Sequence, residues 1–398
     1  MAKSTPRTSR STRSARSNAG EGLLVDEAAQ QSGPEPARAP GSGIALDSIV
    51  GQEHAIGRLR DAVDGGRLHH AYIFHGAHGV GKFTSACALA RALLDPRDGS
   101  AASSQARAGT HPDLHIIRKE LAAISRVDRI RKGKQTTIAV DVLREFLIEP
   151  AGLAAVGSTS SPSGQGQRAS KVFIVDEAEL IDPTGQNALL KTLEEPPAGT
   201  VIILVTSALD RLLATVRSRC QPVLFVPLSE SAMATWLQRS GLGRHAAERS
   251  WLMWFADGSP GLAELAARRG LFAWEDAVGP GLAAALRGAY QATLGPELAR
   301  LTDEQVGLSM KEQPDASKES TNRAWARHMF AFLARRIRDD LRGGGTAGAR
   351  AGGPQIALSA IDALQEAERA MSANVRISDV MESLSVRLST LVRVGVPA

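Results

Sequence analysis

The chain has 398 residues, of which 43% are hydrophobic and 22% charged, a balance typical of ordinary globular domains. It contains no run of about 18 apolar residues, so we expect no membrane-spanning helix. Its two cysteines, Cys87 and Cys220, are too few for a disulfide framework and are typical of a cytoplasmic protein. The formal net charge of +5 equals the charge of residues 1–20, which hold five basic residues and no acid, so net charge does not predict a DNA-binding surface on the rest of the chain.

The first 43 residues are rich in Ser, Arg, Ala, Gly and Pro and nearly lack large apolar side chains. Such a segment cannot bury enough surface to offset the entropy lost on ordering, so residues 1–43 are predicted to be a disordered basic tail. Its arginine-rich, acid-free start is similar to an organelle transit peptide but lacks the apolar face that such a peptide needs. A tail that weakly attracts nucleic acid and a passive extension are the remaining alternatives.

From residue 44 to 226, apolar runs alternate with glycine-rich turns and helical segments. The predicted strands span residues 71–74, 114–117, 171–175, 201–206 and 223–226. Several of these runs are almost continuously apolar, as expected for parallel strands that helices cover on both faces. Residues 44–226 are therefore predicted to form a doubly wound, RecA-like α/β domain.

After residue 226 the strand signals end, and the remaining chain is predicted to be helical. Residues 227–270 are predicted to form a small helical lid domain, and residues 271–398 an all-helical C-terminal domain. In the last predicted helix, apolar residues recur at helical spacing and predict one buried face. They are Met381, Leu384, Leu388 and Leu391.

The strongest local motif follows the first predicted strand. Residues 76–82 read Gly-Ala-His-Gly-Val-Gly-Lys and precede a helical segment, which is the G-x-x-x-x-G-K pattern of a phosphate-binding loop in its strand–loop–helix setting. Gly76, Gly79 and Gly81 allow backbone N–H groups to turn toward phosphate oxygens. Lys82 adds a positive charge at the start of the helix, whose N-terminus also favours anions. These residues are the candidate nucleotide-binding site.

The residue after Lys82 departs from that motif. A magnesium-dependent phosphate loop has Ser or Thr at this position, whereas this chain has Phe83, whose ring cannot coordinate a hard cation. Thr84 is one residue farther on, about 100° around the helix, so it is a candidate but not an automatic substitute. ATP and Mg²⁺ are therefore candidate ligands, and efficient hydrolysis is not expected.

Two acidic residues, Asp176 and Glu177, end the third predicted strand. Beside a phosphate loop, Asp176 would hold Mg²⁺ and Glu177 would polarise an attacking water; two solvated strand-end acids are the alternative. Thr206 ends the next predicted strand and is a candidate sensor of the γ-phosphate, although a polar strand end is common. Arg219 precedes the last predicted strand, where an arginine is either a surface charge or a finger that stabilises charge on a neighbour's ATP.

Taken together, these motifs resemble the clamp-loader branch of the AAA+ ATPases, and within it the delta-prime type of bacterial DNA polymerase III. The run Asn-Ala-Leu-Leu-Lys-Thr-Leu-Glu-Glu-Pro-Pro, followed by Ser-Arg-Cys, is specific to that branch. The likeness is good from about residue 46 to 265 and weak beyond. The blocks that carry it are residues 49–52, 68–72, 76–82, 111–113, 172–179, 187–197 and 218–221.

This resemblance implies an AAA+ domain, a helical lid and a C-terminal collar through which subunits assemble. It implies that Arg219 acts in trans as an arginine finger, and it implies partners: the tau/gamma and delta subunits, the sliding clamp, and primed DNA bound through the complex. No membrane partner is implied, and the protein is expected at the replisome on the nucleoid. Residues 126–135 form a basic stretch, which is either a solvated loop or a contact with DNA phosphates.

Departures from the family pattern decide the expected activity. Phe83 replaces the magnesium-binding hydroxyl, and Gly261 stands where ATPase members carry an arginine that senses the nucleotide. No cysteine lies between residues 94 and 110, so the zinc module of many relatives is not expected. We therefore expect a mostly non-hydrolysing stator of DNA replication, part of the polymerase holoenzyme. The alternatives are a tau/gamma-like ATPase, or an unrelated P-loop enzyme such as a nucleotide kinase.

Overall fold

The computed structural model describes most of the chain, and the predicted tail over residues 1–43 lies outside the described residues. The described residues are 44–94, 111–133, 136–153, 155, 169–313, 317–342 and 353–394.

Five parallel strands form one sheet in the order β2-β3-β4-β1-β5. Strands β3 and β4 are buried along their whole length, because helices cover both faces of the sheet. This confirms the predicted parallel α/β domain. The strands are β1 (Ala71–Gly76), β2 (Leu114–Ile117), β3 (Lys171–Val175), β4 (Thr200–Thr206) and β5 (Gln221–Phe225).

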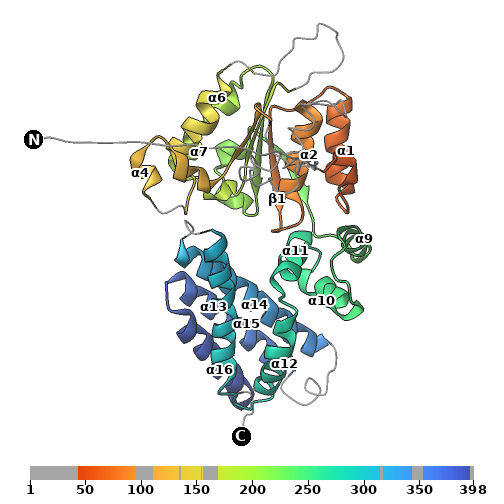
Figure 1. Cartoon of the computed structure of the whole chain (residues 1–398), viewed down its shortest axis with the longest axis vertical. Helices are drawn as coiled ribbons and strands as arrows, with labels where there is room; N and C mark the ends of the chain where they lie inside the picture. The colour runs from red at the N-terminus through yellow and green to blue at the C-terminus, as the bar shows by residue number, and fades with distance from the viewer. Residues whose placement is uncertain are drawn as a thin grey trace, which may run out of the picture. The chain divides into compact units, whose positions relative to one another are not determined.

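Helices α1 and α2 lie on one side of the sheet and α7 on the other (Figure 1). Because successive strand side chains point to opposite faces, Phe74 and Ile203 pack toward α1 and α2, whereas Ile73 and Ile202 pack toward α7. The helices of this domain are α1 (Glu53–Asp64), α2 (Lys82–Leu94), α4 (Asp128–Arg131), α5 (Val140–Leu143), α6 (Glu149–Ala151), α7 (Pro183–Glu194) and α8 (Ala214–Arg217). Short 3₁₀ turns span Leu46–Ser48, Lys119–Ile124, Ala178–Leu180 and Leu209–Arg211, and a π turn spans Arg144–Ile148.

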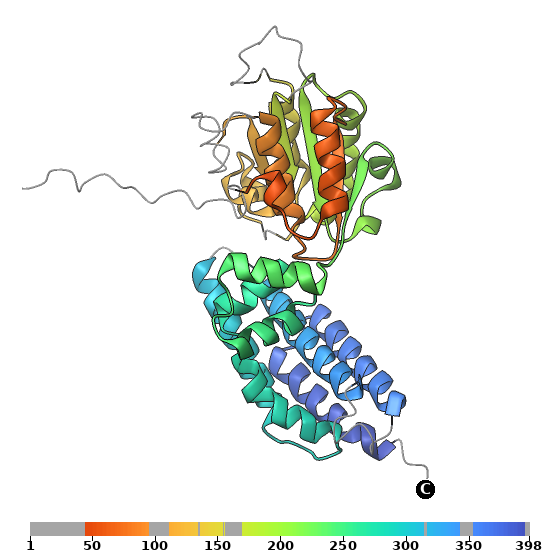
Figure 2. The ribbon, with the colours of Figure 1, turned by 90° about the vertical axis from the view of Figure 1, so that its right-hand side faces the viewer.

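Helices make up the described chain after β5, as predicted, and Figure 2 shows α14, α15 and α16 side by side. They are α9 (Glu230–Ser240), α10 (Ala246–Ala256), α11 (Pro260–Arg269), α12 (Ala273–Leu286), α13 (Leu294–Glu312), α14 (Lys318–Arg342), α15 (Gly353–Ser372) and α16 (Ile377–Val394). Among the described residues, none of the helices is both long and apolar enough to cross a membrane.

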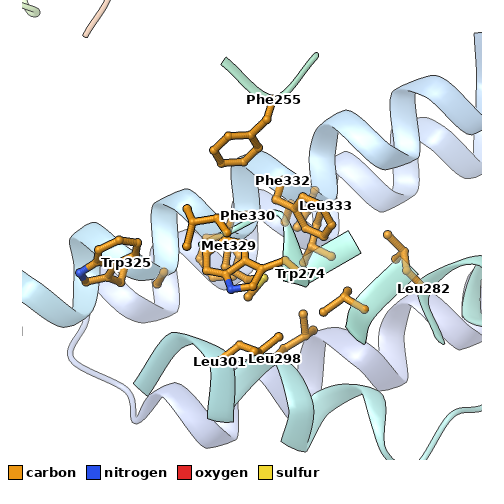
Figure 3. Close-up of a cluster of buried hydrophobic side chains, with 14 of the residues drawn as sticks. Phe255, Trp274, Leu282, Leu298, Leu301, Trp325, Met329, Phe330, Phe332 and Leu333 are labelled. Atoms are coloured by element: carbon orange, nitrogen blue, oxygen red, sulfur yellow. The ribbon is translucent and has the colours of Figure 1, made fainter. Parts of the chain in front are cut away.

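One hydrophobic cluster joins side chains of these helices, and part of it is drawn in Figure 3. Trp274 of α12 and Phe332 of α14 meet edge to face with ring centroids 5.9 Å apart, an arrangement that aromatic rings prefer. In α16, Met381, Leu384 and Leu388 are fully buried in the same cluster, which confirms the predicted apolar face. The helical part of the chain therefore has its own core.

Candidate functional site

The phosphate loop connects the end of β1 to the start of α2, as its sequence predicted. Gly76 has a φ of 141°, and a Cβ there would lie 2.0 Å from the carbonyl oxygen of Phe225. Gly79 has a φ of 75°, and a Cβ there would lie 2.3 Å from the Oγ of Ser259. Both positions combine a left-handed backbone with close packing, so only glycine fits them.

Lys82 is the first residue of α2 and is only 6% exposed. Its Nζ donates hydrogen bonds to the carbonyl oxygens of Gly76, at 2.9 Å, and Ala77, at 2.6 Å. Burial lowers the pKa of Lys82, while the nearby Glu179 and Asp176 carboxylates oppose this shift. The amino group is therefore held against the loop by the chain's own carbonyls.

A pocket of about 940 Å³ lies beside the loop and brings most of the predicted nucleotide-binding residues together. Gly76 is not among the lining residues, and neither is Arg219. The predicted residues that line the pocket are Gly79, Gly81, Lys82, Thr84, Asp176, Glu177 and Thr206.

Helices that follow the sheet domain contribute further pocket residues that the sequence reasoning missed. Trp236 and Arg239 come from α9, and Arg268 comes from α11. Arg268 is largely exposed and pairs with Glu264 at 2.6 Å. No motif marks these residues, because their place in the pocket depends on how α9 and α11 lie against the phosphate loop.

Asp176 has an ion-pair partner that the sequence reasoning also missed. Arg118, the residue after β2, donates from Nε to the Oδ2 of Asp176 at 3.1 Å. The Cζ of Arg118 also lies 4.4 Å from the centroid of the Phe83 ring, a cation–π contact. Lys119 pairs in the same way with Glu177 at 2.7 Å. Both pairs form because β2 and β3 are neighbouring parallel strands, so the residues that follow them lie at the same edge of the sheet, which spacing along the chain does not show.

These residues do not fit a magnesium ion. Magnesium requires oxygen ligands in near-octahedral geometry, but the side chain after Lys82 is the Phe83 ring, and Asp176 already accepts from Arg118. Burial raises the pKa of the Asp176 carboxyl, and the Arg118 guanidinium acts against this shift.

Helix α11 begins directly on the phosphate loop. The backbone N–H of Gly261 donates to the carbonyl oxygen of Gly79 at 2.8 Å, and the Oγ of Ser259 donates to that of His78 at 3.0 Å. A Cβ on Gly261 would lie 3.0 Å from the Cα of Gly79. This contact is the physical reason that an arginine is disfavoured at position 261.

Thr206 ends β4 beside β1, paired in register with His75. Its side chain is 1% exposed, and its Oγ1 accepts a hydrogen bond from the backbone N–H of Ala208 at 3.1 Å. The hydroxyl therefore stabilises the turn after β4, in addition to lying at the pocket.

Arg219 lies between α8 and β5. Its Nη1 donates to the carbonyl oxygen of Thr215 at 2.8 Å, and its Nη2 pairs with the Oε1 of Glu194 at 2.5 Å.

Glu194 is the last residue of α7. The first turn of this helix is fixed by Asp182, because the Asp182 carboxylate accepts a hydrogen bond from the backbone N–H of Gly185. Asp182 is thus the N-cap of α7.

The basic stretch over residues 126–135 includes α4, and Lys134 and Gln135 lie outside the described residues. Arg126 lies 3.5 Å from Glu145, Arg129 lies 3.4 Å from Asp141, and Arg131 pairs with Asp128. Each of these three arginines therefore has an acidic partner within the chain, and both interpretations of the stretch, a solvated loop and a contact with DNA phosphates, stay open.

Comparison with known proteins finds one family that is similar to the part of the chain that holds this site. Residues 51–229 match the family model described as DNA polymerase III, delta subunit. Residues 51–229 are therefore similar to the DNA polymerase III delta/delta-prime clamp-loader family. It is 35% identical over 189 residues to DNA polymerase III subunit delta-prime of Escherichia coli K12, a match that covers 46% of this chain and 50% of that relative.

A second clamp-loader subunit is nearly as similar. DNA polymerase III subunit gamma/tau of Mycobacterium bovis is 34% identical over 198 residues, covering 48% of this chain and 30% of that relative. The chain thus spans about half the length, or less, of these curated relatives. Among solved structures, a gamma-subunit-related protein of Thermotoga maritima is 17% identical with a TM-score of 0.41, covering 83% of this chain and 98% of that one.

Proposed function

We propose that the chain is a delta-prime-type subunit of the DNA polymerase III clamp loader, which helps to load the sliding clamp onto primed DNA. The observation that carries this proposal is Phe83, whose ring lines the pocket where a hydrolysing member of the family needs a magnesium-binding hydroxyl. Gly261 supports the same conclusion, because it has no side chain to sense a nucleotide and a Cβ there would be in tight contact with Gly79.

Arg219 is the residue through which such a subunit would act on ATP. It is one-third exposed and lies outside the chain's own pocket, so it is suited to a nucleotide bound by a neighbouring subunit. A guanidinium is always charged and can contact two phosphate oxygens at once. In this proposal the neighbour is a tau/gamma subunit; the delta subunit, the clamp and primed DNA complete the assembly in the cytoplasm.

A tau/gamma-like ATPase is the second candidate function. It is favoured by the similar identity to the gamma/tau relative and by the retained loop glycines and Lys82. The two candidates differ in one measurable property. A stator has no ATP turnover of its own, whereas an ATPase subunit would approach the ~1–100 s⁻¹ common for phosphoryl transfer.

Reconstitution tests the proposal. The purified chain is mixed with the tau/gamma and delta subunits of the same organism, and assembly is followed by gel filtration. We expect one complex that loads clamps onto primed DNA, and loss of loading when this chain is omitted. Failure to assemble would refute the proposal. ATP turnover by the isolated chain that Lys82→Ala abolishes would assign it to the ATPase subunits instead.

A further inference from the structure

Three segments of the sheet domain meet at the side chain of Arg118. Arg118 follows β2, Asp176 follows the neighbouring strand β3, and Phe83 belongs to the first turn of α2. The guanidinium donates to the Asp176 carboxylate and stacks on the Phe83 ring at the same time. The Arg118 guanidinium therefore contacts both of the positions, 83 and 176, whose side chains would otherwise bind a divalent ion.

The two carboxylates that follow β3, those of Asp176 and Glu177, have further partners. The backbone N–H of Glu177 donates to the Oδ1 of Asp176 at 3.1 Å, so both carboxylate oxygens of Asp176 have donors. Glu177 itself pairs with Lys119. Within the described part of the chain, no group of three or more His, Cys, Asp or Glu side chains is arranged to hold a metal ion.

We propose that Arg118 is a built-in replacement for the magnesium ion of a phosphate-loop pocket. It supplies the positive charge that Asp176 requires, and its planar group uses the Phe83 ring as a surface on which to stack. Arginine suits this place better than lysine, because the guanidinium is less strongly hydrated and stacks on aromatic faces. Phe83 stands where a magnesium-binding loop has a hydroxyl. Its ring and the Arg118 guanidinium contact each other and together take the place of the ion.

A cation within the chain has a consequence that a bound ion does not have. Arg118 joins the ends of β2 and β3 to the start of α2 whether or not a nucleotide or metal is present in solution. A magnesium ion would join the corresponding groups only while it was bound. Arg118 therefore holds this edge of the sheet in one conformation through every step of an ATP cycle in neighbouring subunits, which deepens the proposed stator function.

The experiment compares thermal unfolding of the full chain with ATP plus millimolar Mg²⁺ and with ATP plus EDTA. The wild-type chain should have the same Tm in both solutions. The double variant Phe83→Ser/Arg118→Ala restores a hydroxyl and frees Asp176, so it should gain ~2–4 °C in the Mg²⁺ solution only, the size expected for a ligand present at a few times its Kd. Adding Asp176→Asn to that variant should remove the gain.

The matched control is Phe83→Ser/Arg126→Ala, which replaces an exposed arginine that does not line the pocket and should show no magnesium effect. A magnesium-dependent rise in the wild-type Tm that Asp176→Asn removes would overturn the proposal, and this arm needs no variant that alters Arg118. A double variant that responds no more than the control would overturn it as well. All measurements use the isolated chain. A result that overturns the Arg118 proposal can therefore be distinguished from failure of the subunits to assemble, which would overturn the proposed function.

Discussion

Replacement of Arg219 by alanine separates a finger acting in trans from a surface charge. In the structure Arg219 is 33% exposed and its partner Glu194 is 48% exposed, so their ion pair is worth about 0–1 kcal/mol. For a chain of this size such a loss lowers Tm by only a few degrees, about 2–4 °C per kcal/mol. Arg219→Ala should therefore fold and should assemble with its partners.

The expected functional loss is far larger than this structural one. An arginine finger accelerates phosphoryl transfer about 10³–10⁵-fold at its own site, which corresponds to ~4–7 kcal/mol of transition-state stabilisation. Because a loader would contain several ATP sites, bulk ATPase dilutes the effect of one missing finger. Clamp loading on primed DNA by the reconstituted complex is the more sensitive assay, and we expect it to be strongly depressed.

Arg217→Ala is the control, since Arg217 is exposed and lies two residues away on α8. It should leave clamp loading near the wild-type rate. Glu194→Gln releases Arg219 from its ion pair without removing the guanidinium, and it should retain most of the loading activity. Wild-type loading by Arg219→Ala in an assembled complex would refute the finger role and leave Arg219 as a surface charge.

Three further changes test the structure itself by thermal unfolding. Gly79→Ala should destabilise the chain by ~1–3 kcal/mol, because Gly79 has a left-handed backbone and a Cβ would collide with Ser259; an unchanged Tm would contradict that loop geometry. Asp182→Ala should cost ~1 kcal/mol by removing the N-cap of α7, and a smaller loss with Asp182→Asn would support the capping role. Burial lowers the pKa of His328 to about 4, so the folded state holds a neutral imidazole. The stability that this contributes is complete above pH 6.5 and is lost as the pH falls toward 4. Over that window the wild type should lose up to ~3 kcal/mol more than His328→Gln, and parallel pH profiles would refute the assignment.

The sequence by itself determined the elements of this protein. Apolar runs predicted all five strands, and several of the runs are almost continuous, since buried parallel strands need apolar side chains on both faces. The loop glycines, Lys82 and the N-cap at Asp182 could also be recognised, because the hydrogen bonds and backbone angles that they serve are local. Local chemistry of this kind is visible within a few residues of sequence.

Only the tertiary structure decided which side chains complete the site. Arg118 and Asp176 are 58 residues apart and meet because β2 and β3 are neighbours in the sheet. Gly261 meets the phosphate loop because α11 lies against it, and this contact explains the absence of an arginine there. Such pairings depend on strand order and helix packing, for which spacing along the chain carries no signal. The strand-end acids were therefore visible in the sequence, but the cations that neutralise them were not.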